Sequence, residues 1–175
     1  MNPRLAAETR IEALRELARV ASVMVDGEEA VDAVDRRAWH YIRNPDPEFR
    51  FLVGDYFDVD HGKFLRTKKT LMRLERLVDF PCDASLWLTV PDRPNEVTLL
   101  VHNGSLGRWY TFGQASTQAQ GALKECLEAG ESTTVEDERL LTVVAPVRDS
   151  LGDVVGAVEF SSPHPAREDL APAWS

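Results

Sequence analysis

Cysteine is nearly absent from this chain, which holds only Cys82 and Cys126 among 175 residues. Two thiols are too few to build a tetrahedral cysteine metal site, and a chain kept in a reducing compartment rarely holds a structural disulfide. The sequence therefore predicts two free thiols. Cys126 falls on the apolar face of a helix, where a buried cysteine behaves as a small hydrophobe, and Cys82 is expected to be more exposed.

Long apolar runs and excess positive charge are missing as well. No segment approaches the roughly 18 residues of a membrane span, and the N-terminal MNPRLAAETR lacks the apolar core of a signal peptide. With 20 Lys and Arg against 29 Asp and Glu, the net charge is -9. These features predict a cytoplasmic protein that binds neither nucleic acid nor anionic membranes. A local basic cluster is interpreted as the solvated face of a helix: Arg66, Lys68, Lys69, Arg73 and Arg76.

What is present suits one folded domain with a helical extension, since 43% of the residues are hydrophobic and 28% are charged. Apolar residues recur every three or four positions over 4–25, 28–42 and 63–79, which predicts three amphipathic helices. Asp26-Gly27 separates the first two, and Asn44-Pro45-Asp46-Pro47 ends the second. The stretch from 49 to 62 has no clear assignment.

The period then changes from 3.6 to 2. Ser85–Val90 and Val97–His102 are predicted to form a hairpin, with Arg108–Phe112 as a short third strand. A fourth helix is expected over Ser116–Ala129, capped by Ser116 and closed by a left-handed Gly130. Two further strands, Leu140–Val147 and Val154–Phe160, are joined by a turn containing Gly152. Pro146 cannot donate to a strand ladder, which places it at an edge or a bulge.

The segment ALKECLEAGESTTVEDERLLTVVAPVRDSLGDVVGAVEFSSP, residues 122–163, resembles the C-terminal half of GAF domains. The shared features are a helix ending in Ala129-Gly130, an acidic loop, a strand ending in Pro146-Val147, a turn with Gly152 and a strand beginning Val155-Gly156-Ala157. LMRLERLVDFPCDASLWLTV looks like the first GAF helix leading into the first strand. The resemblance covers residues 62–162, and the hairpin pattern also occurs in PAS and Cache sensor domains.

This resemblance implies an α+β fold with an antiparallel sheet of five to six strands flanked by helices. We therefore expect three parts: a GAF-like domain at 62–162, a helical segment at 1–61, outside the resemblance, whose apolar stripes predict a dimerisation or partner surface, and a loose tail at 163–175. Such modules bind a small molecule between sheet and helices, or only dimerise. The signatures of bilin-binding, cyclic-nucleotide-binding and methionine-sulfoxide-reducing GAF proteins are not matched, so no cofactor is named.

Six residues are predicted to contact a ligand between the sheet and the fourth helix: Trp87, Leu99, Val101, Trp109, Phe112 and Leu123. Aromatic residues with a polar atom often line pockets, but they are also ordinary core residues, and core packing is favoured. His102 ends a strand that would face the pocket, although a surface histidine is the simpler interpretation. Asp55, Asp58, Asp60 and Gly62 are similar to a calcium loop, but His61 and Lys68 occupy positions that need acids. No metal site is therefore predicted.

Three hypotheses for function follow. The first is a sensory module in which a small ligand or a protein partner shifts the helices relative to the sheet. The second is a structural adaptor with a packed interior, and the third, least favoured, is a small enzyme. No catalytic constellation is recognised. The apolar stripes at 11–25 and 31–42 predict a homodimer, and a separate protein partner is expected to carry the output.

Overall fold

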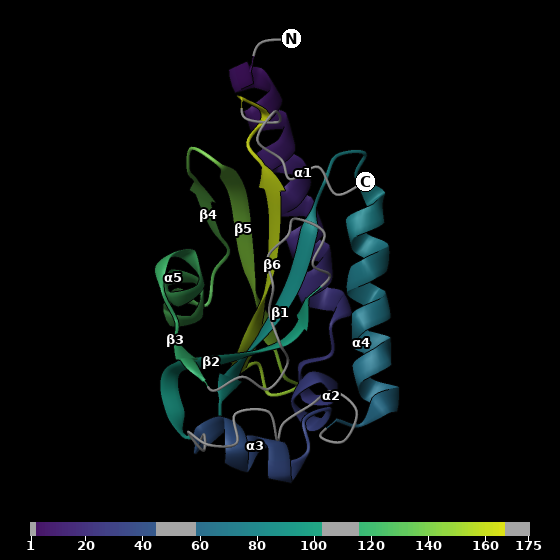
Figure 1. The fold of residues 1–175 in the computed structure, drawn as a ribbon, viewed down its shortest axis with the longest axis vertical. Helices are drawn as coiled ribbons and strands as arrows, with labels where there is room; N and C mark the ends of the chain where they lie inside the picture. The colour runs from purple at the N-terminus through teal and green to yellow at the C-terminus, as the bar shows by residue number, and fades with distance from the viewer. Residues whose placement is uncertain (1–2, 45–58, 103–115, 167–175) are drawn as a thin grey trace.

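The computed structural model describes residues 3–44, 59–102 and 116–166. Six strands form one antiparallel sheet in the order β3-β2-β1-β6-β5-β4, with helices on both faces (Figure 1). The strands are β1 Asp83–Val90, β2 Arg93–His102, β3 Thr117–Gln118, β4 Thr133–Glu136, β5 Leu140–Arg148 and β6 Val154–Pro163. The helices are α1 Pro3–Met24, α2 Gly27–Asp32, α3 Arg36–Arg43, α4 His61–Leu74 with the 3-10 turn η1 Glu75–Leu77, and α5 Gly121–Ala129. The predicted α+β class, a flanked antiparallel sheet with an N-terminal helix, is confirmed.

Helix α1 packs against one face of the sheet and contributes to the hydrophobic core. Its apolar stripe is buried against β5 and β6, with Leu14, Ala18 and Ala21 fully shielded from solvent. Figure 1 shows α1 running behind the sheet along much of its length. The stripe at 11–25, which suggested a dimer surface, is therefore covered within the chain. Residues on both sides of the expected boundary at 61 and 62 contribute to one core.

The segment 28–42 forms two short helices instead of the single helix that was predicted. Asp26 accepts a hydrogen bond from the backbone N–H of Glu29 and caps α2, and Asp35 accepts one from Arg37 N–H and caps α3. Because Asp35 can cap a new helix, the chain turns between α2 and α3. Val34, within this turn, forms an isolated β-bridge with Val59. Both helices still bury their apolar residues in the core.

Asp60 is the N-cap of helix α4, and its carboxylate accepts a hydrogen bond from Lys63 N–H at 3.0 Å. Phe64, Leu71 and Leu74 face inward. Asp60 is thus a helix cap, while Asp55 and Asp58 lie outside the described residues. None of the helices in the described ranges combines the length and apolar character needed to cross a bilayer.

The elements implied by the GAF resemblance are all found in residues 122–163. Gly130 closes α5 with φ +67°, and Pro146 pairs with Ala157 beyond the end of β4, where β5 becomes an edge. The acidic residues Glu136, Asp137 and Glu138 lie at the end of β4 and in the loop before β5, and β4 itself was not predicted. One expectation is wrong: the helix begins at Gly121, not Ser116, because Thr117 and Gln118 pair with β2 as β3. The expected strand at Arg108–Phe112 lies outside the described residues.

Gly152 has φ +90° in the turn between β5 and β6, and nothing lies within 4 Å of the position that a Cβ atom would occupy. A side chain there would strain the backbone without meeting a neighbour. Gly152→Val is expected to destabilise the protein by about 1–3 kcal/mol, measured by urea denaturation. Leu151→Val, at the exposed preceding position, is the control and should change stability by under about 0.5 kcal/mol. Equal stability of the two variants would contradict the strain.

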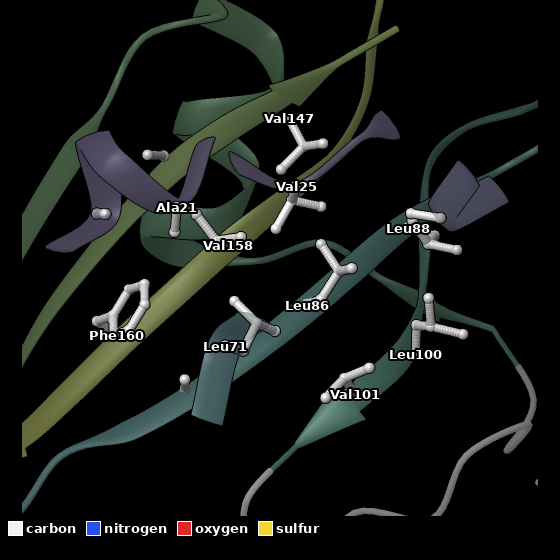
Figure 2. Close-up of a cluster of buried hydrophobic side chains, with 14 of the residues drawn as sticks. Ala21, Val25, Leu71, Leu86, Leu88, Leu100, Val101, Val147, Val158 and Phe160 are labelled. Atoms are coloured by element: carbon white, nitrogen blue, oxygen red, sulfur yellow. The ribbon is translucent and has the colours of Figure 1, made fainter. Parts of the chain in front are cut away.

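The two faces of the sheet differ in chemistry. The face under α1 and α4 is apolar: Leu86 and Leu88 of β1, Val158 and Phe160 of β6, and Val147 of β5 pack together (Figure 2). Alternation along the strands sends the intervening side chains to the opposite face. There, α5 covers Val144 and Ala157 with Cys126. The remainder of that face combines apolar residues with buried polar ones, and these buried polar residues make it the candidate functional site.

Candidate functional site

Two cross-strand rows of polar residues lie on the face of the sheet that carries α5. In the first row Asp83 of β1 pairs with Ser161 of β6, which pairs with Thr142 of β5. In the second row Ser85 of β1 lies between His102 of β2 and Glu159 of β6. Asp83, Ser85 and Ser161 have no exposed surface and Glu159 is 9% exposed. Such burial of polar groups is costly unless they are hydrogen-bonded.

Glu159 is the centre of a hydrogen-bonded network. Its Oε2 accepts a hydrogen bond from the indole Nε1–H of Trp87 at 2.9 Å, and its Oε1 accepts one from the Ser161 hydroxyl at 3.2 Å. Ser161 Oγ lies 3.0 Å from Thr142 Oγ1. Trp87 therefore holds the carboxylate from one side, and the Ser161 hydroxyl, which also contacts Thr142, holds it from the other. The arrangement fixes a negatively charged acceptor on the sheet.

A second polar pair lies beside this network. Ser85 Oγ is 2.9 Å from Nδ1 of the half-buried His102. The histidine thus meets the serine through Nδ1, whereas a Ser-His-Asp triad presents Nε2 to the nucleophile and keeps Nδ1 for the acid. Within the described residues no group of three or more His, Cys, Asp or Glu side chains is placed to hold a metal ion.

A groove of about 470 Å³ opens between α5, β3 and the sheet. Its polar lining comes from Glu159, Thr142, Gln118 and Gln120, together with Thr117. Its apolar lining is formed by Trp87, Val97, Ala122, Leu123, Val135 and Val144. The volume falls in the range of small-molecule sites, which is about 300–1,000 Å³.

Strand β3 forms one wall of this groove and is anchored by a side-chain contact. Ser116, directly before β3, donates its hydroxyl proton to the carboxylate of Glu96, which also accepts from Arg93. These donors, Ser116 first, lower the pKa of Glu96 despite partial burial. Ser116 is therefore an anchor for β3 and not the helix cap that the sequence suggested.

Three of the six predicted ligand residues come together on this face. Trp87 pairs with Leu99 across β1 and β2, and Leu123 of α5 lines the groove with Trp87. Val101 lies on the opposite face, packed in the core with Leu86 (Figure 2). A β-bulge causes this difference: Leu86 pairs with Val101 but Trp87 pairs with Leu99, so strict alternation along β2 fails at Leu100. Trp109 and Phe112 lie outside the described residues.

Glu159, Ser161 and Thr142 were missed from the sequence, although a signal was present. Within Val158-Glu159-Phe160-Ser161, apolar and polar residues alternate, which places the polar pair on one face of the strand. That alternation is also typical of a solvent-exposed face. The burial of Glu159 and Ser161 is what distinguishes a site from an ordinary surface.

Neither cysteine belongs to the polar network. Burial raises the pKa of the Cys126 thiol to about 11, so Cys126 is protonated at neutral pH and is a poor nucleophile. Its burial on the helix is confirmed. Cys82, expected to be more exposed, is buried at 6% exposure because it joins the core at the start of β1.

No family model matches the chain, and no curated protein matches it in sequence. Solved structures are similar to it in fold. One is a GAF domain, 13% identical, with 86% of this chain and 73% of that chain covered and a TM-score of 0.47. Another is an A. aeolicus GAF domain in an inactive state, 11% identical, with 87% of this chain and 86% of that chain covered and a TM-score of 0.42. A third is the periplasmic sensory domain of a Campylobacter jejuni chemoreceptor, 13% identical, with 99% and 61% covered and a TM-score of 0.48. These likenesses concern the fold, and no ligand or partner is transferred from them.

Proposed function

We propose that this chain is a sensory domain that binds a small molecule in the groove beneath α5. The observation that carries the proposal is the buried polar network around Glu159 at the floor of that groove. Concave sites with apolar walls and a few fixed polar groups are the usual form of small-molecule sites. Here the walls are Leu123, Val97 and Val144, and the fixed polar group is the carboxylate.

The network also favours a sensor over an adaptor with a packed interior. Desolvating a carboxylate costs free energy even when hydrogen bonds offset part of that cost, and a face that only packs against a helix does not need a buried carboxylate. The same sheet shows the alternative on its other side, where Leu86, Leu88 and Phe160 form a largely apolar interface with the helices and, among the residues that the structure describes there, no carboxylate is buried. A ligand gives the polar groups a role that packing does not.

The chemistry of the groove indicates which ligands fit. A fixed carboxylate attracts an ammonium, amidinium or other N–H donor and disfavours phosphates and free carboxylates. The apolar walls suit a compact aliphatic or aromatic body. We therefore propose a small amphipathic molecule whose nitrogen donates to Glu159 Oε1 or Oε2. We propose no catalytic step, since Ser85 is fully buried and meets His102 through Nδ1.

Cytoplasmic location, a homodimer and a protein partner that carries the output also belong to this proposal. The homodimer no longer has the stripe of α1 as its basis, because the sheet covers Leu14 and Ala18. Sedimentation of the whole chain at tens of micromolar tests it directly, and a monomer at that concentration would contradict it.

A thermal-shift screen of amino acids, aliphatic and aromatic amines and nucleobases tests ligand binding. A binder is expected to raise the melting temperature and to change tryptophan fluorescence, because Trp87 lines the groove. Glu159→Gln keeps the shape and an acceptor for Trp87 but removes the charge. For a cationic ligand it should weaken binding by about tenfold or more, since charge-assisted hydrogen bonds contribute about 1.5–3 kcal/mol.

Glu138→Gln, at an exposed position, is the matched control and should leave the affinity unchanged. Equal loss in the two variants would show a general charge effect and contradict a site at Glu159. The absence of any binder at millimolar concentration would favour the adaptor.

A further inference from the structure

The outer surface of α4 and η1 carries a charge opposite to that of the chain as a whole. The chain has a net charge of -9, yet His61–Leu77 contains one acid, Glu75, and a set of basic residues. The basic residues are Lys63, Arg66, Lys68, Lys69, Arg73 and Arg76. Four of them follow the spacing i, i+3, i+7 and i+10, which aligns them along one side of a helix. We call Arg66, Lys69, Arg73 and Arg76 the basic stripe.

Most of the basic stripe is not neutralised by the chain itself. Arg66 forms an ion pair with Glu29. Within the part of the chain that the structure describes, Lys69, Arg73 and Arg76 form no ion pair. Helix α1 is different, because three of its four arginines pair with glutamates three or four residues away: Arg4 with Glu8, Arg15 with Glu12 and Arg19 with Glu16.

The unpaired charges of α4 affect the stability of the helix. Like charges at i, i+3 and i+4 destabilise a helix by a few tenths of a kcal/mol per pair. Helix α1 avoids that cost by alternating its charges, and α4 does not. An exposed row of unpaired cations on an otherwise acidic protein is complementary to an anionic partner.

The basic stripe borders a groove of about 360 Å³ between α4, α2 and the end of α1. Arg66, Lys69 and Arg73 line one side, and Met24, Val25, Asp26 and Glu29 line the other. Met24 is 58% exposed and the adjacent Val23 is 80% exposed, so apolar surface lies beside the cations. A groove of this mixed character fits a peptide segment with both acidic and apolar side chains.

We propose that the basic stripe and its groove dock an acidic segment of a partner protein. A polyanion such as nucleic acid or an anionic membrane fits less well, because Asp26 and Glu29 lie in the groove and the whole chain is acidic. An acidic segment places carboxylates opposite Lys69 and Arg73, and an apolar side chain against Met24. The docking surface lies on the far side of the sheet from the ligand groove, since Leu71 of α4 packs with Leu86 of β1 on the apolar face (Figure 2). The proposed docking of a partner protein is therefore independent of whether a ligand binds beneath α5.

Fluorescence anisotropy with the full chain tests the proposal. The probe is a labelled helical peptide with glutamates at i, i+3, i+7 and i+10 and leucines beside them. It should bind, and the affinity should fall as salt rises from about 50 to 200 mM, because screening shortens the range of surface charges. The double variant Lys69→Glu/Arg73→Glu should weaken binding by about tenfold or more.

Lys124→Glu/Arg139→Glu is the matched control, because it changes the net charge equally on the surface near α5 and β5. It should leave binding within about twofold of the unchanged protein. Equal loss in both double variants, or no binding of the peptide, would overturn the proposal. So would tighter binding of phosphatidylserine vesicles or a single-stranded oligonucleotide than of the peptide. Self-association that the Lys69→Glu/Arg73→Glu change abolishes would assign the stripe to a second copy of the chain instead.

Discussion

Leu14→Ala is expected to destabilise the protein by about 3–5 kcal/mol, whereas Leu5→Ala on the same helix should change stability by under about 0.5 kcal/mol. Leu14 is 0% exposed between α1 and the sheet, while Leu5 is 58% exposed. Removing the buried side chain loses transfer free energy and leaves a cavity in a close-packed interior. Urea denaturation of the two variants measures the difference in the free energy of unfolding. Leu5→Ala is the control, because it is the same substitution at an exposed position of the same helix.

The same packing predicts that a chain beginning at Gly62 does not fold cooperatively. Without α1 the sheet would expose the surface now covered by Leu14, Leu17 and Ala18, and α2 and α3 would be lost as well. Circular dichroism during heating is expected to show a broad, non-cooperative change. A sharp transition in the shortened chain, or a Leu14→Ala cost below about 1 kcal/mol, would mean that α1 is a detachable extension.

Periodic apolar patterns gave a correct account of the long helices. The spacing of Ile11, Leu14, Ala18, Ala21 and Val25 predicts one buried stripe, and all five are buried, four in α1 and Val25 directly after its end. The spacing does not say what covers the stripe. A second copy of the chain and a sheet from the same chain present the same apolar surface, so only the tertiary structure decides between them.

Positions with a specific backbone requirement were also predicted well. Gly130 closes a helix and Gly152 forms a turn, and both have positive φ. Glycine indicates such conformations because most residues with a Cβ atom are strained there, although Asp92 and Asn95 also adopt positive φ in this chain. Local side-chain competition was harder to judge. Asp35 starts a new helix inside an apparent one, and Ser116 bonds to Glu96 instead of capping α5.

The candidate site was predicted in part, and the reason lies in strand geometry. Trp87, Leu99 and Leu123 were placed on one face by alternation and helix periodicity. Alternation failed at Val101 because one extra residue in β2 reverses the faces beyond it. A bulge of this kind has no signature in Leu99-Leu100-Val101, where every residue is apolar. Glu159 required burial to be recognised, and burial depends on distant parts of the chain.

Gly156→Ala is expected to destabilise the protein by about 3 kcal/mol or more, although its backbone conformation permits a side chain. A Cβ atom at Gly156 would lie 2.3 Å from the carbonyl oxygen of Trp87 and 3.3 Å from Leu88 Cα. Because the first contact is backbone, β1 and β6 must separate at the centre of the sheet. Gly156, which lies between two apolar residues near the start of β6, is therefore required because β1 approaches its Cα too closely for a side chain.

Moving β1 at Trp87 also disturbs the candidate site. The indole of Trp87 hydrogen-bonds Glu159 of the same strand pair. We expect Gly156→Ala to lower the melting temperature by about 6–12 °C, since 1 kcal/mol corresponds to about 2–4 °C at this chain length. Tryptophan fluorescence of the folded variant should shift to longer wavelength as Trp87 becomes more hydrated.

Gly62→Ala is the matched control for this substitution. Its Cβ atom would meet only side-chain atoms, Asp60 Oδ1 at 3.2 Å and Arg66 Nη1 at 3.5 Å, and alanine is the better residue inside a helix. Gly62→Ala is therefore expected to be neutral or to stabilise the protein by up to about 1 kcal/mol. If Gly156→Ala instead came within about 1 kcal/mol of this control, β1 and β6 would not approach as closely as described. The Trp87–Glu159 hydrogen bond would then not depend on the spacing of β1 and β6.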